Sequence, residues 1–128
     1  MTTNLEIVLA FIDLWATRDL DRILDEMDVD CVYHNMPWEP LIGHAAISES
    51  LDGFVKGSEA IDWVVLHAAE AADGTVMTER LDRFLIGGEW IEMNVMGIFE
   101  LVDGKIARWR DYFDSAQFHE QMATVATN

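Results

Sequence analysis

Three turn signals divide the second half of this chain into segments with a period of two residues. The signals are the dipeptides Asp73-Gly74, Gly87-Gly88 and Asp103-Gly104, which suit two-residue hairpin turns because residues in such turns adopt a positive φ. Apolar and polar residues alternate between these turns, as they do in half-buried strands. The sequence therefore predicts four antiparallel strands, at about residues 61–71, 75–86, 89–102 and 105–114.

The first half of the chain has the period of helices instead. Apolar residues recur three or four positions apart from Leu5 to Trp15, and Thr3 or Asn4 is placed to cap that helix. Further elements are expected in the order helix, strand, helix and C-terminal helix, at about residues 19–27, 31–35, 44–55 and 115–125. Three helices ahead of a run of strands predict one α+β domain over residues 1–128, with the helices covering one face of a curved sheet and a pocket between the layers.

Charge and composition exclude several classes of partner. The chain has 24 acidic and 8 basic residues, which gives a formal net charge of −16. Nucleic acids and anionic membranes require a basic patch, so we expect neither as a partner. Cys31 is the one cysteine, so no internal disulfide can form, and no segment has the pattern of a signal peptide or a membrane span. We therefore expect a cytoplasmic protein.

Two of the predicted strands carry charged residues on a face that is otherwise apolar. Alternate side chains of a strand share a face, so Arg80 points the same way as Asp82, and Asp111 the same way as Trp109 and Phe113. If both faces line one cavity, an arginine lies between two carboxylates in an apolar pocket. Such a cluster can keep one carboxyl group protonated while the other stays charged, which paired acid and base chemistry requires.

Three segments of the chain together resemble the signature segments of the limonene-1,2-epoxide hydrolase family. They are Tyr33-His34-Asn35-Met36-Pro37, Arg80-Leu81-Asp82 and Trp109-Arg110-Asp111-Tyr112-Phe113-Asp114. Their order and approximate spacing also match, over roughly residues 5–120. The resemblance implies a cone-shaped fold of the nuclear-transport-factor-2-like type, usually a homodimer, without cofactor or metal. It also implies a reaction in which water opens an epoxide to a vicinal diol in one step.

The resemblance assigns a role to each of five polar residues. Asp111 is similar to the base that takes a proton from water, and Tyr33 and Asn35 to the groups that hold that water. Asp82 resembles the acid that protonates the epoxide oxygen, and Arg80 the bridge between the two acids. Independently of the family, water is a poor nucleophile and an alkoxide a poor leaving group. A base and an acid on opposite sides of the epoxide address both difficulties.

Six apolar residues are the candidates for contact with a small apolar epoxide. Membership of the hydrophobic core is the alternative reading of these positions. They are Met93, Val95, Phe84, Trp109, Phe113 and Phe118, of which Trp109 is expected to form a pocket wall rather than a catalytic group. The opposite face of the strand at 89–102 carries Trp90, Met96, Ile98 and Val102, which would suit a partner subunit or a covering helix. No two histidines have a metal-ligand spacing, so we expect no metal site.

Three alternatives to the epoxide hydrolase reading stay open at this point. The two acids and the arginine could form a structural ion network without catalytic use. A ketosteroid-isomerase-like or polyketide-cyclase-like enzyme of the same fold would also use a carboxylate in such a pocket. A small-ligand-binding dimer module without activity is the third alternative, because folds are widely reused. Arg80 argues against the isomerase, since a bridge between two acids has no evident use in moving a proton on carbon.

Overall fold

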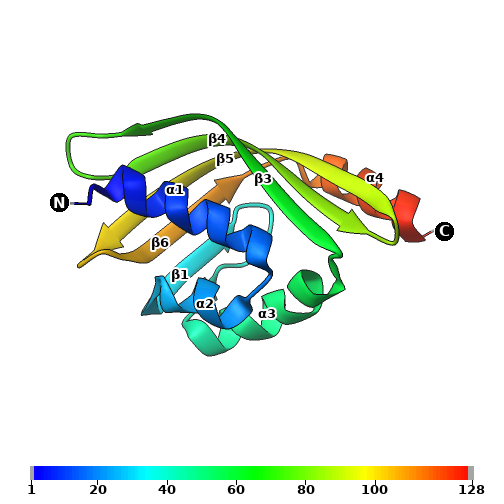
Figure 1. The fold of residues 1–128 in the computed structure, drawn as a ribbon, viewed down its shortest axis with the longest axis horizontal. Coiled ribbons are helices and arrows are strands. Elements are labelled where there is room, and N and C mark those ends of the chain that lie inside the picture. Colours follow the sequence, from blue (N-terminus) through cyan, green and yellow to red (C-terminus); the bar gives the residue numbers. More distant parts are fainter. Residues whose placement is uncertain (1, 127–128) are drawn as a thin grey trace.

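A computed structural model describes residues 2–126 of the chain, which form one six-stranded mixed sheet with three helices on one side and a fourth at its edge (Figure 1). In chain order the elements are α1 (Asn4–Leu14), the short 3₁₀ helix η1 (Trp15–Thr17), α2 (Leu20–Asp25), β1 (Met27–Asn35), β2 (Leu41–Ile42), α3 (His44–Gly57), β3 (Ala60–Glu70), β4 (Val76–Ile86), β5 (Glu89–Val102), β6 (Lys105–Tyr112) and α4 (Ser115–Ala126). The predicted α+β class, with three helices packed over the sheet, is confirmed. Among the described residues, no helix combines the length and apolarity that crossing a bilayer needs.

The strand order is β2-β1-β6-β5-β4-β3. Sequence reasoning did not predict the two-residue strand β2, which pairs with β1, or the pairing of β1 with β6. These two strands run parallel, with Tyr33 opposite Trp109 and Asn35 opposite Asp111, whereas the other neighbours are antiparallel. The strand expected at 31–35 is longer, because it begins at Met27. This pairing matters for function, because it sets the first signature segment beside the third.

Two of the three turn predictions are confirmed and one is wrong. Gly87-Gly88 and Asp103-Gly104 have positive φ at both positions, from 50° to 78°, as a two-residue turn of this hand requires. The connection at Asp73-Gly74 is longer, since β3 ends at Glu70 and β4 begins at Val76. There the Asp73 carboxylate accepts a hydrogen bond from the backbone N–H two residues on, which is the turn that an aspartate forms with its own chain.

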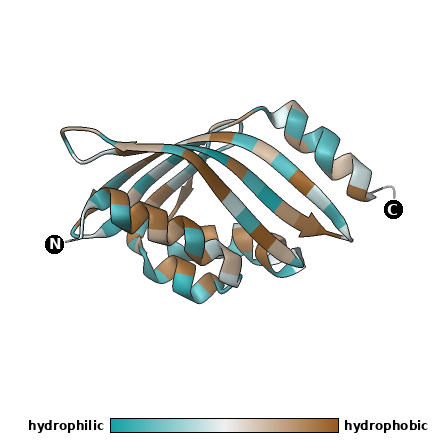
Figure 2. Cartoon of the chain, turned by 45° about the horizontal axis from the view of Figure 1, so that its top comes forward, coloured by the Kyte–Doolittle hydropathy of each residue, from teal (hydrophilic) through white to brown (hydrophobic). Residues whose placement is uncertain are grey.

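The core lies between the sheet and α1, α2 and α3. Along the strands apolar and polar residues alternate, so one face of the sheet is apolar and packs on the helices (Figure 2). Phe11 of α1 meets Trp109 of β6 edge to face, with ring centroids 5.3 Å apart, and Trp15 stacks on Trp63 of β3 at 4.2 Å. The expected cap of the first helix is Thr3, whose hydroxyl accepts from the backbone N–H of Glu6.

Helix α4 covers an edge of the sheet rather than a face. The pairing of β5 with β6 ends at Met96 and Tyr112, so the earlier part of β5 has no strand on that side. The side-chain oxygens of Gln117 and Gln121 accept hydrogen bonds from the backbone N–H groups of Asn94 and Glu92, each at 3.2 Å. The outer face of β5 remains open, with Trp90, Met96 and Val102 exposed, so no helix in the described part of the chain covers it.

Candidate active site

A cavity of about 180 Å³ lies between the apolar face of the sheet and the helices. Eight of its fifteen lining residues are aromatic, and the two acidic ones are Asp82 and Asp111. Five of the six predicted contact residues line it, namely Phe84, Met93, Val95, Phe113 and Phe118. The cavity is therefore an apolar space with two carboxyl groups in its wall.

Arg80 joins the two carboxylates through a complete set of hydrogen bonds. Its Nε and Nη2 donate to the two oxygens of Asp82, both at 2.9 Å, and its Nη1 and Nη2 donate to those of Asp111 at 3.2 and 2.8 Å. Nη1 also donates to the hydroxyl of Thr78 at 3.1 Å. A guanidinium has five N–H groups, so each of them has an acceptor here.

The local sequence explains how three charged side chains fit together inside a sheet. Alternation along β4 places Thr78, Arg80 and Asp82 on the inner face, and antiparallel pairing sets Gly97 of β5 between Thr78 and Asp111 of β6. A Cβ atom on Gly97 would lie 2.6 Å from the Asp111 Oδ1 atom and closer still to Arg80 Nη1. The absence of a side chain at position 97 therefore leaves the space in which the guanidinium meets the second carboxylate.

Burial sets the protonation of this cluster. The side chains of Arg80, Asp82 and Asp111 are 0%, 6% and 4% exposed, so two ionised acids would leave one uncompensated charge away from water. Burial raises the pKa of Asp82 to about 6, although the guanidinium of Arg80 opposes that shift. Burial also disfavours the charged Arg80, but the two carboxylates outweigh it and hold the Arg80 pKa above its ordinary value. The cluster therefore carries one proton more readily than isolated aspartates do.

Strands β1 and β6 lie side by side in Figure 1. Their parallel pairing sets Asn35 opposite Asp111 and Tyr33 opposite Trp109. The Tyr33 hydroxyl donates to the side-chain oxygen of Asn35 at 3.3 Å, and both residues line the cavity. Burial and the nearby Asp111 raise the pKa of Tyr33 above its ordinary value, so the phenol stays neutral. The structure thus brings four of the five predicted polar residues into the wall of one cavity, and the fifth, Arg80, is buried behind the two acids.

Trp109 is the predicted contact residue that the cavity does not include. Its side chain is completely buried in the core, and its indole Nε1 donates to Asp111 Oδ1 at 2.7 Å. The prediction of a pocket wall is corrected, because the ring lies behind Asp111 between Tyr33 and Phe99. Alternation placed Trp109 on the correct face but could not show whether the ring reached the open space.

Sequence reasoning also missed several walls of the cavity. They are Trp15, Trp38, Ser50, Leu51, Phe54 and Trp63. Trp63 pairs with Asp82 across β3 and β4, so its position follows once that register is known. The others come from helices and a loop, whose packing no strand period predicts. The ring of Phe118 lies between two of these walls, with its centroid 5.3 Å from that of Trp38 and 6.5 Å from that of Phe54.

Other titratable groups lie apart from this cluster. Burial, with a smaller effect of Asp28, raises the pKa of the Cys31 thiol to about 12, so this thiol stays protonated and unreactive. His34, whose neighbours Tyr33 and Asn35 line the cavity, contacts the backbone oxygen of Trp38. The described residues contain no group of three His, Cys, Asp or Glu side chains arranged to hold a metal ion.

Comparison with known proteins identifies a family whose members resemble this chain. The model of the limonene-1,2-epoxide hydrolase (LEH) catalytic domain matches residues 2–124. An LEH-like epoxide hydrolase from M. tuberculosis is 26% identical, with a TM-score of 0.80 over 97% of this chain and 92% of its own. The epoxide hydrolase/cyclase-like enzyme SalBIII is 18% identical, with a TM-score of 0.80 over 89% of this chain and 92% of its own.

A third similar structure widens the range of activities found on this architecture. A protein named as a SnoaL-like polyketide cyclase from Shewanella putrefaciens is 14% identical, with a TM-score of 0.82 over 94% of this chain and 96% of its own. At such identity, the likeness of the Shewanella protein and of SalBIII to this chain shows the fold alone. That fold is of the nuclear-transport-factor-2-like and SnoaL-like type. The family match covers nearly all of the described residues and includes all three signature segments. The chain therefore belongs to the limonene-1,2-epoxide hydrolase family.

Proposed function

We propose that this protein is a cofactor-independent epoxide hydrolase that adds water to a small apolar epoxide, cyclic, terpene or aryl, and gives a vicinal diol. The observation that carries the proposal is the bridge of Arg80 between Asp82 and Asp111, with both carboxyl groups in the wall of an apolar cavity. The family match and the aromatic walls of the cavity support it.

The proposed reaction is a single displacement. Asp111 takes a proton from a water molecule that Tyr33 and Asn35 orient, and the water oxygen forms a bond to one epoxide carbon. The bond from that carbon to the ring oxygen breaks, and Asp82 gives its proton to the oxygen that leaves. The cluster then has its proton on Asp111 instead of Asp82. Arg80 contacts both carboxyl groups, so it keeps them close enough for the proton to return through water or product.

Carboxamide variants of the two acids test this assignment. Asp82→Asn removes the proton donor and Asp111→Asn removes the base, so each should lower diol formation by at least about a hundredfold. Asp62→Asn is the matched control, because Asp62 also pairs with an arginine but on the outer face of the sheet. Folding of all three variants is checked by circular dichroism and thermal unfolding. Near-normal turnover in either inner variant would show that the roles are wrong.

The path of oxygen is tested in a single turnover in ¹⁸O-labelled water. Direct attack by water puts the label into the diol in the first turnover. Label that appears first in an aspartate would indicate an ester intermediate and would overturn the one-step reaction. A panel of epoxides, ketosteroids and polyketide analogues separates this activity from the isomerase and cyclase alternatives. Tight binding of an epoxide with no turnover at any pH would favour a binding module.

We also propose that the protein is a homodimer that joins through the outer face of its sheet. The cross-strand row of Glu79, Met96 and Tyr112 lies on that face, and Leu66 lies nearby on β3. Leu66, Met96 and Tyr112 are 51%, 52% and 43% exposed, so this face presents open apolar area around Glu79. Sedimentation should give twice the mass of the chain, and Met96→Lys should give a monomer. A monomeric wild-type protein at about 100 μM would contradict this proposal.

A further inference from the structure

The two carboxyl groups of the inner cluster do not have the same set of donors. Asp82 receives two hydrogen bonds, both from Arg80. Asp111 receives two from Arg80 and a third, from Trp109 Nε1, which at 2.7 Å is the shortest of the five. A hydrogen bond donated to a carboxylate favours its charged form. Arg80 donates two hydrogen bonds to each acid, so the indole hydrogen bond to Asp111 is the difference between them.

The N–H of Trp109 is held in place from both sides. Its ring stacks on Tyr33 at 4.3 Å and on Phe99 at 5.2 Å, with the planes within 23° of parallel in each pair. Phe11 of α1 meets it edge to face, and no part of the side chain is exposed. A donor fixed in this way needs no reordering when it contacts a carboxylate, so its full effect falls on Asp111.

No other group facing Asp111 creates the same difference. The charged and titratable groups around it are Arg80 and Asp82 on β4 and Tyr33 on β1. Arg80 gives two hydrogen bonds to each acid, and the hydroxyl of Tyr33 donates to Asn35. Among the described residues, Trp109 is thus the donor that contacts one acid and not the other.

We propose that Trp109 is a positioning residue, whose indole N–H holds Asp111 in its charged form and thereby keeps the shared proton of the cluster on Asp82. This inference rests on the proposed hydrolase function, because it sets which acid begins the reaction as proton donor and which begins as base. It also gives the reaction a direction. Water is activated on the side of Tyr33 and Asn35, and the epoxide oxygen is protonated on the side of Asp82.

The sharpest test replaces the N–H without changing the ring. In 3-benzothienylalanine a sulfur atom takes the place of the indole N–H, so a protein with this residue at position 109 should keep the stacks on Tyr33 and Phe99. A hydrogen bond to a charged group corresponds to a factor of roughly ten to a hundred, so the preference of the proton for Asp82 should fall by that factor. Trp109→Phe makes the same change but leaves a cavity, so it serves as a second variant.

The primary readout is the location of the proton, measured by ¹³C NMR of carboxyl-labelled aspartates across the pH range. Asp82→Asn and Asp111→Asn assign the two signals. In the wild type, the first proton to bind should appear on Asp82, whereas in the benzothienylalanine protein it should be spread over both acids. Trp63→Phe is the control, because it also removes an indole N–H at the cavity, one that has no partner among the described residues. The control should leave the proton on Asp82.

Kinetics give a second readout that a purely structural role would not move. In the benzothienylalanine protein, kcat should fall about tenfold or more while KM changes by less than about twofold. The acidic limb of kcat/KM should also move to higher pH, by about one unit. An unchanged proton location in this protein would overturn the inference even if the wild type makes diol. If the proton lies on Asp82 in a wild-type protein that makes no diol, the inference about Trp109 stands and the hydrolase proposal is refuted instead.

Discussion

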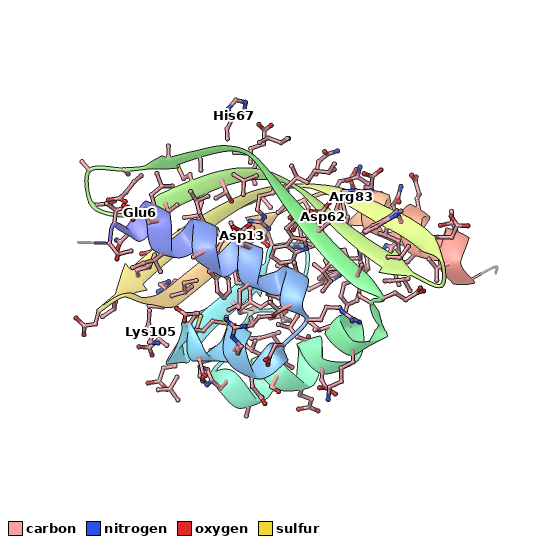
Figure 3. The ribbon with its side chains drawn as sticks, viewed as in Figure 1. Glu6, Asp13, Asp62, His67, Arg83 and Lys105 are labelled. Atoms are coloured by element: carbon pink, nitrogen blue, oxygen red, sulfur yellow. The ribbon has the colours of Figure 1, made fainter. Side chains whose placement is uncertain are left out.

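Strand β4 carries two arginines three positions apart, and each bridges two carboxylates on its own side of the sheet. On the inner face Arg80 joins Asp82 and Asp111, and on the outer face Arg83 joins Asp62 and Glu92 at 2.8 and 3.0 Å. Figure 3 shows Arg83 and Asp62 on the outer surface, away from the core. The two clusters contain the same kinds of ions, so their comparison separates the effect of ion type from the effect of place.

The difference between the clusters is access to water. The three side chains of the outer cluster are 27%, 54% and 49% exposed, whereas none of the inner ones exceeds 6%. Exposed ion pairs contribute about 0–1 kcal/mol, because water solvates the separated charges almost as well. A buried pair that loses one partner leaves a charge without compensation, at a cost of about 3–5 kcal/mol. Burial therefore favours a bound proton in the inner cluster, whereas the exposed outer cluster, with one arginine and two carboxylates as well, has no need of one.

The largest expected effect comes from changing the inner arginine. Arg80→Lys keeps the charge but offers three N–H donors on one atom, so the five hydrogen bonds of the guanidinium cannot all be kept. We expect the free energy of unfolding to fall by about 3–5 kcal/mol and diol formation to be lost. Urea unfolding at pH 7 measures the first and product analysis the second. A fall in the free energy of unfolding smaller than about 1 kcal/mol would mean that the hydrogen bonds of the buried guanidinium do not stabilise the fold.

The second effect is the pH dependence of stability, which only the inner cluster should show strongly. Burial raises the pKa of Asp82 from 3.8 to about 6, so between these values the folded state binds a proton that the unfolded state releases. The contribution of Asp82 to stability is therefore complete below about pH 4 and is lost as the pH rises through about 6. Its size is about 3 kcal/mol at most.

Asp82→Asn tests this contribution, because the acids outside the inner cluster titrate equally in both proteins. The difference in unfolding free energy between wild type and variant should change by up to about 3 kcal/mol between pH 4 and 7, in the sense that the wild type loses stability as the pH rises. The same proton should set the basic limb of kcat/KM near pH 6 in the free enzyme. A difference that does not vary with pH would refute a proton on the inner cluster.

The third effect tests whether space, as well as burial, maintains the inner cluster. In Gly97→Ala the added methyl group would lie too close to Arg80 and Asp111, so the pair must separate. Overpacking should lower stability by about 1–3 kcal/mol, and misplacement of the acids should lower kcat by about a hundredfold. Gly53→Ala in α3 is the matched control, since its Cβ would have no neighbour within 4 Å and the helix should gain up to about 1 kcal/mol. Normal turnover in Gly97→Ala would show that the close approach is not needed.

The same contrast explains what the sequence could and could not predict. Period and turn residues predicted the helices and the long strands, because those signals are local. The parallel pairing of β1 with β6 depends on residues more than 70 positions apart, such as Asn35 and Asp111, and no local pattern encodes it. Alternation nevertheless indicated Arg80, Asp82 and Asp111, because ions on an apolar face are conspicuous, and the resemblance of the three segments to a family indicated Tyr33 and Asn35.

The sequence could not show how deeply each side chain on the apolar face is buried behind the cavity wall. Trp109 and Phe113 share one face of the chain around β6, yet Phe113 lines the cavity and Trp109 is completely buried behind Asp111. That distinction depends on how far the helices lie from the sheet at each point. The walls formed by Trp38 and Phe54 were missed for the same reason, since loops and helix faces take their positions from packing.

The smallest expected effect comes from the outer arginine and completes the comparison. Arg83→Met removes two ion pairs and the contact of the guanidinium with the Trp90 ring at 4.2 Å, all of them near water. We expect a loss of about 1 kcal/mol or less, and diol formation within about twofold of the wild type. The loss should shrink further in about 1 M salt, where the screening length is about 3 Å, whereas the cost of Arg80→Lys should hardly change. Equal salt dependence of the two variants would contradict the view that access to water separates the clusters, because screening ions reach only the exposed one.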